Sequence, residues 1–469
     1  MKRIHLIGIC GTGMATAALM LKDLGLEVGG SDEHAYPPMS DLLAARGIVP
    51  LQGYREEHIT DDLDMVVVGN AVSRGNPEVE AVLDRRLRYC SLPELVRETF
   101  LRERRPIVVA GTHGKTTTSF MTAWALNASG VDAGFLVGGV SKDLQTSGRV
   151  GGGPFVIEGD EYDSAFFDKT AKFLKYLPDI VVVNGIEFDH ADIYHDLEEL
   201  RLAFERLVRL VPRRGRLLLS ADDQEAAALR AGAFCPVETF GFAAGADWRA
   251  ERVRYGPQST SFDVTRQGRP VGSVVLPLLG RFNVRNALGA AAAAVGAGAP
   301  AAAVLDALGR FHGVRRRLDV RGVVRGVTVY DDFAHHPTAV CETLQALRQA
   351  AGGRIWAVFE PRSATACRRV FQNEFAAALR LADRVVVADV FRSSLPAAER
   401  LSEAALVSDL SAGGVEARHV PRVADIVAYV ASGARQGDRV VVMSNGGFGG
   451  IHESLLTALA DTAAAADAP

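Results

Sequence analysis

Lysine is scarce in this chain. Only seven lysines, at positions 2, 22, 115, 142, 169, 172 and 175, stand among the 52 lysines and arginines of the 469 residues. Arginine therefore supplies the positive charge at most positions that have one. A lysine inside a glycine-bearing motif then indicates a place where a compact ammonium on a flexible stem is needed.

Three other features are missing as well. The formal net charge is −4, so the chain has no basic footprint and we expect no nucleic-acid partner. The five cysteines, at 10, 90, 235, 341 and 367, have no C-x-x-C spacing, which favours buried thiols in a reducing compartment. No apolar run approaches the roughly 18 residues of a membrane span, and a strand pattern near the N-terminus leaves no room for a signal peptide. We expect a cytoplasmic protein with no membrane partner.

The chain is too long for one hydrophobic core, and three domains of about 150 residues each are expected. Three stretches each begin with a strand pattern and a glycine loop, which predicts an α/β fold built from three units in series. We place the units at residues 1–104, 105–314 and 315–469. The charged stretch 97–105, which Pro106 closes, is the expected linker between the first two.

The segment AGTHGKTTT, residues 110–118, follows the apolar run 107–109 and precedes a helical pattern. A strand, a glycine loop with Lys-Thr and a helix form a nest of backbone N–H groups for nucleotide phosphates. Val109 stands where the longer Walker pattern has glycine, so this is a shorter variant. The alternative is a Gly/Thr-rich turn with no ligand. The residues expected to bind the nucleotide are Gly111, Thr112, His113, Gly114, Lys115, Thr116 and Thr117.

Two further strand ends carry candidate metal ligands. Glu158 follows the apolar run 155–157, and His190 follows the run 180–183. Ligands of parallel α/β sheets bind outside the carboxyl ends of the strands, so Thr116, Glu158 and His190 are candidates for holding Mg²⁺ beside the nucleotide. Taken alone, Glu158 can belong to a solvated acidic loop and His190 can be structural.

The first unit has a weaker glycine turn, Gly8-x-x-Gly11-x-Gly13, with Ser31 and Asp32 at the end of the next strand. Glycine allows a diphosphate to approach the backbone closely, and Ser31 or Asp32 can meet a ribose or a base. A tight turn with no ligand is the alternative. A rival function, an NAD-dependent oxidoreductase, is disfavoured because the spacing is not G-x-G-x-x-G.

The third unit opens with three consecutive arginines, Arg315 to Arg317, and continues to Asp332 and His335 after a strand. An arginine at this junction can stabilise the charge of a transferring phosphoryl group when the unit closes. A solvated arginine face is equally compatible with the pattern.

Together these segments resemble the Mur ligase family, the ATP-dependent amide ligases of peptidoglycan synthesis. The resemblance covers almost the whole chain. Its motifs are GTHGKTTT, the acidic segment after Ile157, IEFDHAD at 186–192, GRFNVRN at 280–286, RRLD at 316–319 and DDFAHHP at 331–337.

The resemblance implies a Rossmann-like N-terminal domain for UDP-N-acetylmuramate, a central P-loop ATPase-like domain and a Rossmann-like C-terminal domain for a peptide. Lys115, Arg317 and His335 would be catalytic. Asn283 and Asn286 would lie near the adenine, and Arg317 and Asp332 would reach ATP. The diphosphate would lie over the first glycine turn and the uridine near Ser31 and Asp32. Candidates for the peptide carboxylates are Arg362, Ser363, Ser444 and Asn445.

Five segments, at 31–40, 69–78, 161–169, 359–366 and 443–452, are most similar to family members that attach the murein tripeptide L-alanyl-γ-D-glutamyl-meso-diaminopimelate during murein recycling. Members that attach L-alanine alone are the alternative. The chain departs from the family twice. Phe282 replaces a common histidine, and no lysine follows Lys175 that could form the carbamate bridging two metals in several members.

Overall fold

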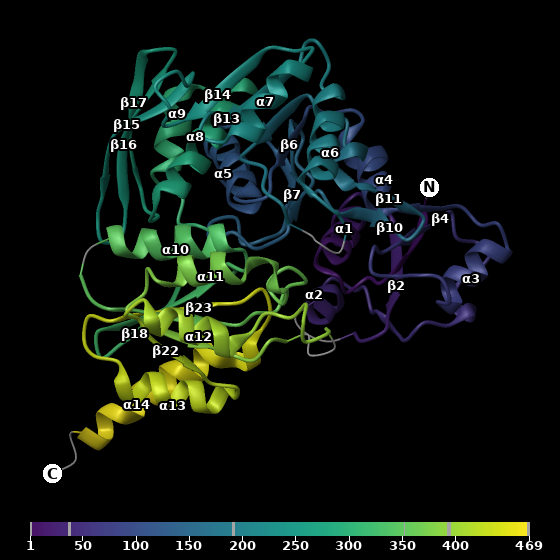
Figure 1. Ribbon diagram of the computed structural model, residues 1–469. Helices are drawn as coiled ribbons and strands as arrows, with labels where there is room; N and C mark the ends of the chain where they lie inside the picture. The colour runs from purple at the N-terminus through teal and green to yellow at the C-terminus, as the bar shows by residue number, and fades with distance from the viewer. Residues whose placement is uncertain (1, 36–38, 190–192, 351, 392–394, 467–469) are drawn as a thin grey trace.

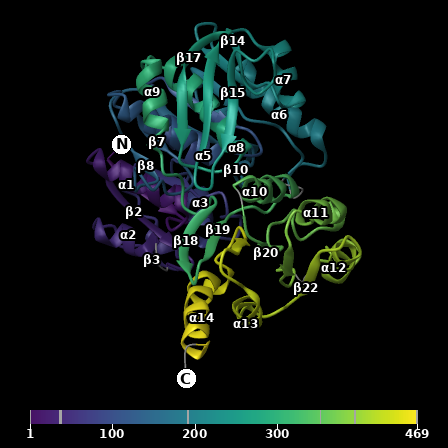
Figure 2. The ribbon, with the colours of Figure 1, turned by 90° about the vertical axis from the view of Figure 1, so that its left-hand side faces the viewer.

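The computed structural model describes residues 2–35, 39–189, 193–350, 352–391 and 395–466, with side chains up to residue 461. Three sheets divide the chain into an N-terminal, a central and a C-terminal unit, and the central unit lies above the other two in both views (Figures 1 and 2). Most strand pairs are parallel, so the expected α/β class is confirmed. Within the described residues, no helix has the length and hydrophobicity needed to cross a membrane.

The N-terminal unit is a five-stranded parallel sheet in the order β3-β2-β1-β4-β5. Buried aliphatic residues on β1 and β4 form its centre. Its strands are β1 (Arg3–Ile7), β2 (Glu27–Asp32), β3 (Leu51–Gln52), β4 (Met65–Val68) and β5 (Tyr89–Ser91). Its helices are α1 (Thr12–Asp23), α2 (Met39–Ala45), α3 (Pro77–Asp84) and α4 (Leu92–Val96).

The central unit is a ten-stranded sheet in the order β17-β16-β15-β14-β13-β12-β6-β9-β7-β8. Its parallel strands are β6 (Pro106–Ala110), β7 (Gly134–Leu136), β9 (Phe155–Gly159), β12 (Ile180–Val183), β13 (Arg216–Ser220) and β14 (Val237–Gly241). β15 (Trp248–Tyr255), β16 (Thr260–Arg266) and β17 (Arg269–Leu276) form an antiparallel extension, and β8 (Gly148–Arg149) is a short edge strand. A separate hairpin joins β10 (Asp163–Ala165) to β11 (Asp168–Ala171).

Five α-helices accompany this sheet: α5 (Lys115–Ala128), α6 (Leu197–Arg209), α7 (Gln224–Ala228), α8 (Arg281–Gly296) and α9 (Ala301–Leu308). The alanine-rich segment does form two helices, but α8 begins at Arg281, one turn and more before the expected Asn286. Gly280, with φ +92°, precedes the first residue of α8 and sets its start. Asn283 and Asn286 therefore lie in the first turns of this helix.

The C-terminal unit is a six-stranded sheet in the order β18-β19-β23-β20-β21-β22, parallel except for the β18–β19 hairpin. Its strands are β18 (Asp319–Val324), β19 (Val327–Asp332), β20 (Ile355–Phe359), β21 (Arg384–Val387), β22 (Glu416–His419) and β23 (Arg439–Met443). Its helices are α10 (Pro337–Gln349), α11 (Gln372–Leu379), α12 (Glu403–Ala412), α13 (Val423–Gly433) and α14 (Ile451–Ala466). α14 extends away from the central unit (Figure 2).

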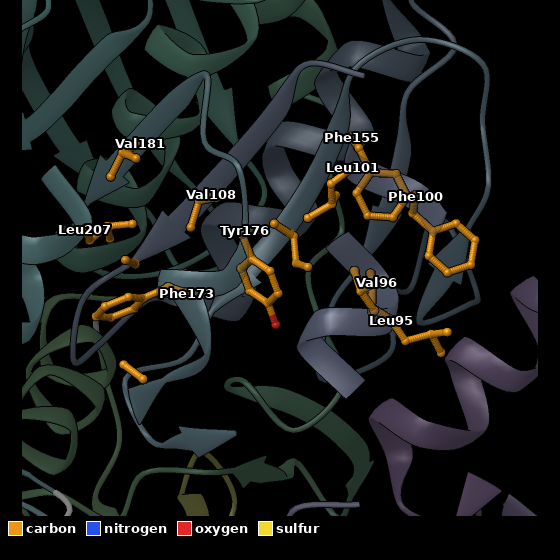
Figure 3. Packing of buried hydrophobic residues seen from close by; sticks show 14 of the residues in the cluster. Leu95, Val96, Phe100, Leu101, Val108, Phe155, Phe173, Tyr176, Val181 and Leu207 are labelled. Atoms are coloured by element: carbon orange, nitrogen blue, oxygen red, sulfur yellow. The ribbon is translucent and has the colours of Figure 1, made fainter. Parts of the chain in front are cut away.

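The segment expected as a linker is helical in its first half. A π-helical turn, Arg97–Leu101, continues α4 and buries Phe100 and Leu101. The Phe100 ring stacks on Phe155 of β9 with centroids 6.0 Å apart (Figure 3). Charged residues flank this apolar pair on both sides, so composition alone suggested a solvated connector. Because of this packing, the N-terminal and central units share one hydrophobic cluster.

Candidate functional site

The loop between β6 and α5 has a conformation that requires glycine. Gly111 and Gly114 have φ values of +123° and +78°. A Cβ on Gly114 would lie 2.5 Å from the Asn286 side-chain oxygen and 2.8 Å from the Asn184 side-chain nitrogen. The loop is thus packed tightly onto the end of β12 and the first turns of α8, and the N-terminus of α5 directly follows it.

Lys115 is the first residue of α5, and its ammonium is fully engaged within the loop. Nζ donates to the Gly111 carbonyl at 2.9 Å and forms an ion pair with Glu161, at 3.0 and 2.9 Å from the two carboxylate oxygens. Burial lowers the pKa of Lys115, but Glu161 and Asp160 outweigh burial and the net pKa is raised. Lys115 is therefore positively charged at neutral pH, at the point where the loop ends and α5 begins.

Thr116 and Glu158 lie together, as the sequence predicted. The Thr116 hydroxyl donates to Glu158 Oε1 at 2.6 Å, and the Gly138 N–H donates to Oε2 at 2.7 Å. Burial, followed by the charge of Asp160, raises the pKa of Glu158 to about 7. A hydroxyl and a carboxylate side by side are hard oxygen donors that fit Mg²⁺. His190, the third predicted ligand, lies outside the described residues.

The C-terminal unit brings Arg317 to the loop 111–114 between β6 and α5, which together with Lys115 and Thr116 is called the phosphate loop below. Arg317 Nη2 donates to the Thr116 hydroxyl at 3.4 Å, and its guanidinium lies over the Phe333 ring, 4.8 Å from the centroid. Desolvation lowers the pKa of Arg317 below its usual range. A guanidinium still remains charged at neutral pH. The structure thus brings this arginine beside Thr116, and its contact with ATP stays a prediction.

Asp332 is the last residue of β19, and His335 lies in the loop that follows it. The Asp332 carboxylate accepts from the Leu318 and Ala334 N–H groups at 2.6 and 2.9 Å, so it shapes the loop that carries Arg317. Burial raises the pKa of Asp332 and lowers the pKa of His335. His335 Nε2 lies 3.9 Å from Asp189, which places this imidazole at the junction with the central unit.

The two asparagines of α8 are buried. Asn283 donates to the Leu279 carbonyl at 2.8 Å, and Asn286 Nδ2 lies 3.4 Å from the Asn283 oxygen. The Asn286 side-chain oxygen lies 2.5 Å from where a Cβ on Gly114 would stand, so Asn286 packs closely against this loop.

The first glycine turn is held by β2. The Gly8 and Ile9 N–H groups donate to the Ser31 carbonyl at 2.8 and 3.0 Å, and the Cys10 N–H donates to Asp32 at 2.9 Å. Gly8 has φ +81°, and Gly11 and Gly13 border the start of α1. The Asp32 carboxylate therefore builds the turn.

Ser31 is fully buried, and its hydroxyl donates to Glu78 at 2.5 Å instead of facing the turn. Glu78 is a residue that sequence reasoning missed. Its carboxylate is completely buried and also meets His5 at 3.2 Å and His58 at 2.6 Å. The only sequence signal was its position in GNPE, three residues after Gly75.

The candidates for peptide binding cluster at the carboxyl ends of β20 and β23. Ser444 donates to Glu360 at 2.5 Å, and Arg362 lies 3.6 Å from Glu360 and over the Phe391 ring. Ser363 caps the local turn by accepting from the Ala366 N–H at 2.9 Å. The buried Asn445 side-chain oxygen has no hydrogen-bond partner in the part of the chain that is described.

Three matches to family profiles span most of the chain. Residues 3–104 match the Mur ligase family catalytic domain, 109–294 the Mur ligase middle domain, and 316–446 the Mur ligase glutamate ligase domain. The UDP-N-acetylmuramate–L-alanyl-γ-D-glutamyl-meso-2,6-diaminoheptandioate ligase of Escherichia coli K12 is 43% identical over 468 residues, covering 99% of this chain and all of the relative.

Two solved structures align with nearly the full chain. The murein peptide ligase of Psychrobacter arcticus is 37% identical with a TM-score of 0.72, covering 98% of this chain and 99% of its own. The UDP-N-acetylmuramate–alanine ligase of Thermotoga maritima is 25% identical with a TM-score of 0.81, and the alignment covers 98% of this chain and 100% of that one. The expected three-domain architecture is confirmed. On these matches, the chain belongs to the Mur ligase family.

Proposed function

We propose that this protein uses ATP and Mg²⁺ to join the tripeptide L-alanyl-γ-D-glutamyl-meso-2,6-diaminoheptandioate to UDP-N-acetylmuramate. The observation that carries the proposal is the 43% identity to the tripeptide ligase of E. coli over essentially the whole of both chains. The convergence of Lys115, Thr116, Glu158 and Arg317 at one loop supports the phosphoryl-transfer part of it.

In the first step, a carboxylate oxygen of UDP-N-acetylmuramate attacks the γ-phosphorus of ATP, an acyl phosphate forms and ADP leaves. Lys115 and Arg317 carry two positive charges at the same loop and offset the charge that develops on the phosphoryl oxygens. Thr116 and Glu158 would hold Mg²⁺, which supplies further charge neutralisation when bound. Gly111 and Gly114 have positive φ angles and no side chain, so the phosphates can come close to the backbone N–H groups there.

In the second step, the tripeptide's free amine attacks the acyl carbon, the amide bond forms and inorganic phosphate leaves. The amine must first lose a proton. His335 is suited to accept it because burial lowers its pKa and keeps the imidazole neutral at pH 7. Arg362, Ser444 and Asn445 lie on the same unit and would orient the peptide.

Attachment of L-alanine alone is the second candidate, and the TM-score of 0.81 to the T. maritima enzyme favours it. A TM-score over three domains also depends on the angles between those domains, whereas sequence identity does not. We therefore give the identity more weight.

The test is a parallel assay of product formation from UDP-N-acetylmuramate and ATP with either the tripeptide or L-alanine. We expect efficient ligation of the tripeptide and little ligation of alanine. Efficient use of alanine alone would assign the second candidate function.

The phosphate-loop assignment has its own test. Lys115→Ala should lower kcat by at least about 100-fold, because it removes a charge that acts on the transferring phosphoryl group. Binding of UDP-N-acetylmuramate, measured by calorimetry, should be retained. Lys169→Ala is the matched control, because Lys169 lies on the surface in an exposed pair with Asp163. Full turnover in Lys115→Ala would refute the assignment.

A further inference from the structure

A second group of possible metal ligands lies beside the phosphate loop, apart from Thr116 and Glu158. It consists of His113 from the loop, Glu187 from the segment after β12, and His336 at the N-terminus of α10. His113 Nε2 is 3.0 Å and His336 Nδ1 is 3.6 Å from the same Glu187 oxygen, Oε2. The three residues come from two units of the chain, so their meeting is a product of the tertiary fold.

The spacing of these atoms suits a small transition-metal ion. One ligand atom from each residue lies within 4.8 Å of the other two. In a tetrahedral zinc site with bonds of about 2.0–2.1 Å, the ligand atoms are roughly 3.3 Å apart. Two of the separations already lie within a few tenths of an ångström of that value. A modest rotation of the side chains would complete the set.

The hydrogen bonds of His336 indicate its tautomer: Nε2 carries the ring proton and Nδ1 carries the lone pair. Nε2 lies 3.2 Å from the Phe188 carbonyl, which can only accept, so Nε2 carries the proton. Nδ1 accepts the long helix-capping hydrogen bond of the Thr338 N–H at 3.3 Å and lies 3.6 Å from Glu187 Oε2, so a bound metal ion would take the place of this capping hydrogen bond. A carbonyl that holds the second ring nitrogen is the usual support of a metal-bound histidine.

Access and burial are also appropriate. The His336 side chain is 6% exposed, whereas those of His113 and Glu187 are 20% and 38% exposed. One ligand is thus fixed in the interior and the other two are partly exposed to solvent. Two imidazoles and one carboxylate, with a fourth position open to water, form a known zinc donor set.

We propose that His113, Glu187 and His336 form a binding site for Zn²⁺ that bridges the central and C-terminal units. The site is distinct from the oxygen-rich pair Thr116–Glu158, because its two imidazoles favour zinc over magnesium. The proposal does not rest on the proposed ligase function, since it concerns the protein and the metal alone.

The test measures Zn²⁺ binding to the full chain by calorimetry in the absence of ATP. Excess Mg²⁺ is present so that it, and not Zn²⁺, occupies the oxygen donors Thr116 and Glu158. We expect one Zn²⁺ per chain. Loss of an outer-shell partner typically weakens metal binding about 10–100-fold, so His336→Ala and Glu187→Gln should each weaken it at least that much. Co²⁺ in place of Zn²⁺ should show the strong visible absorption of four-coordinate cobalt, and this should disappear in His336→Ala.

Two control variants locate the ion. His312 forms an exposed pair with Asp143 at 2.7 Å but has no third ligand in the described structure, so His312→Ala should bind Zn²⁺ normally. Glu158→Gln should also retain it. His336→Cys, which replaces one zinc ligand by another, should recover binding that His336→Ala loses, and circular dichroism checks that each variant folds. Absence of binding, binding unchanged in His336→Ala, or loss in Glu158→Gln would overturn the proposal.

Discussion

At the scale of single residues, the charge on Lys115 is paired within the protein itself. Glu161 is 1% exposed and holds the ammonium at 2.9 Å, while two loop carbonyls accept its other hydrogens. Any phosphate that binds the loop must compete with Glu161 for this cation. The pair therefore affects both the stability of the free protein and its affinity for nucleotide.

Glu161→Gln separates these two effects. Removal of one partner from a buried ion pair costs about 3 kcal/mol, so the free variant should unfold at lower urea concentration. ATP should then stabilise the variant more than the wild type, because it meets a lysine without a competing carboxylate. Urea unfolding with and without ATP measures both effects. Glu98→Gln breaks an exposed pair with Arg102 and should change stability by at most about 1 kcal/mol. A Glu161→Gln protein as stable as wild type would contradict the argument.

Glu78 gives a prediction about pH. Burial raises its pKa, but hydrogen bonds with His5, Ser31 and His58 outweigh burial, so the pKa lies below its usual 4.5. A carboxylate with a lowered pKa stabilises the folded state above the unfolded pKa, and this contribution disappears as pH falls through the folded value. The difference in unfolding free energy between wild type and Glu78→Gln should be constant above about pH 6 and shrink below 4.5.

Urea titrations from pH 7 down to the acid limit of folding will measure this difference. The exposed Glu57→Gln provides the control and should show little difference at any pH. A gap that widened on acidification would mean that Glu78 is protonated in the folded protein at neutral pH.

The same residues show what sequence could and could not predict. The pairing of Thr116 with Glu158 followed from the rule that strand ends meet at one edge of a parallel sheet. The partnership of Ser31 with Glu78 spans 47 residues and two helices, and no spacing rule links them. Likewise, His113, Glu187 and His336 meet only because the C-terminal unit docks beside the phosphate loop.

At the scale of elements, strongly apolar strands such as β6, β12 and β23 were predictable because burial on both faces leaves a continuous aliphatic run. The short strands β7, β8, β10 and β11 were not, because two to four residues give no measurable period. The alanine-rich helix α8 has a separate explanation. Ala290, Ala291, Ala293 and Ala294 are all buried, so alanine here serves close packing of helices and strands.

Ala290→Leu tests this interpretation. Extra methylenes in a packed core force neighbours apart and cost about 1–3 kcal/mol, although leucine and alanine are both good helix formers. Ala302→Leu lies on the exposed face of α9. It makes the same change in helix propensity without overpacking the core, so it should hardly alter the free energy of unfolding. Chemical denaturation of both variants provides the comparison, and equal stability of the two would show that α8 tolerates larger side chains.

At the scale of the whole molecule, the three units are not joined equally. The N-terminal and central units share a cluster that runs from Ile4 through Phe100 to Phe155 and beyond. The C-terminal unit has hydrophobic clusters of its own, and it meets the central unit through polar contacts together with a few apolar ones, such as Leu279 against the C-terminal cluster. Examples of the polar contacts are Thr365 with Asp189 at 2.7 Å and Arg285 with Glu342 at 2.9 Å. Polar junctions of this kind permit the C-terminal unit to move, as ligation of three substrates requires.

This asymmetry predicts two unfolding transitions in calorimetry, one for the N-terminal and central units together and one for the C-terminal unit. Phe100→Ala removes a buried ring at the shared cluster and should destabilise the first transition by about 3–5 kcal/mol, leaving the second in place. Phe375→Ala removes a buried ring from the C-terminal cluster and should act on the second alone. A single cooperative transition that both variants shift would mean that the polar junction couples the C-terminal unit as firmly as the shared core couples the other two.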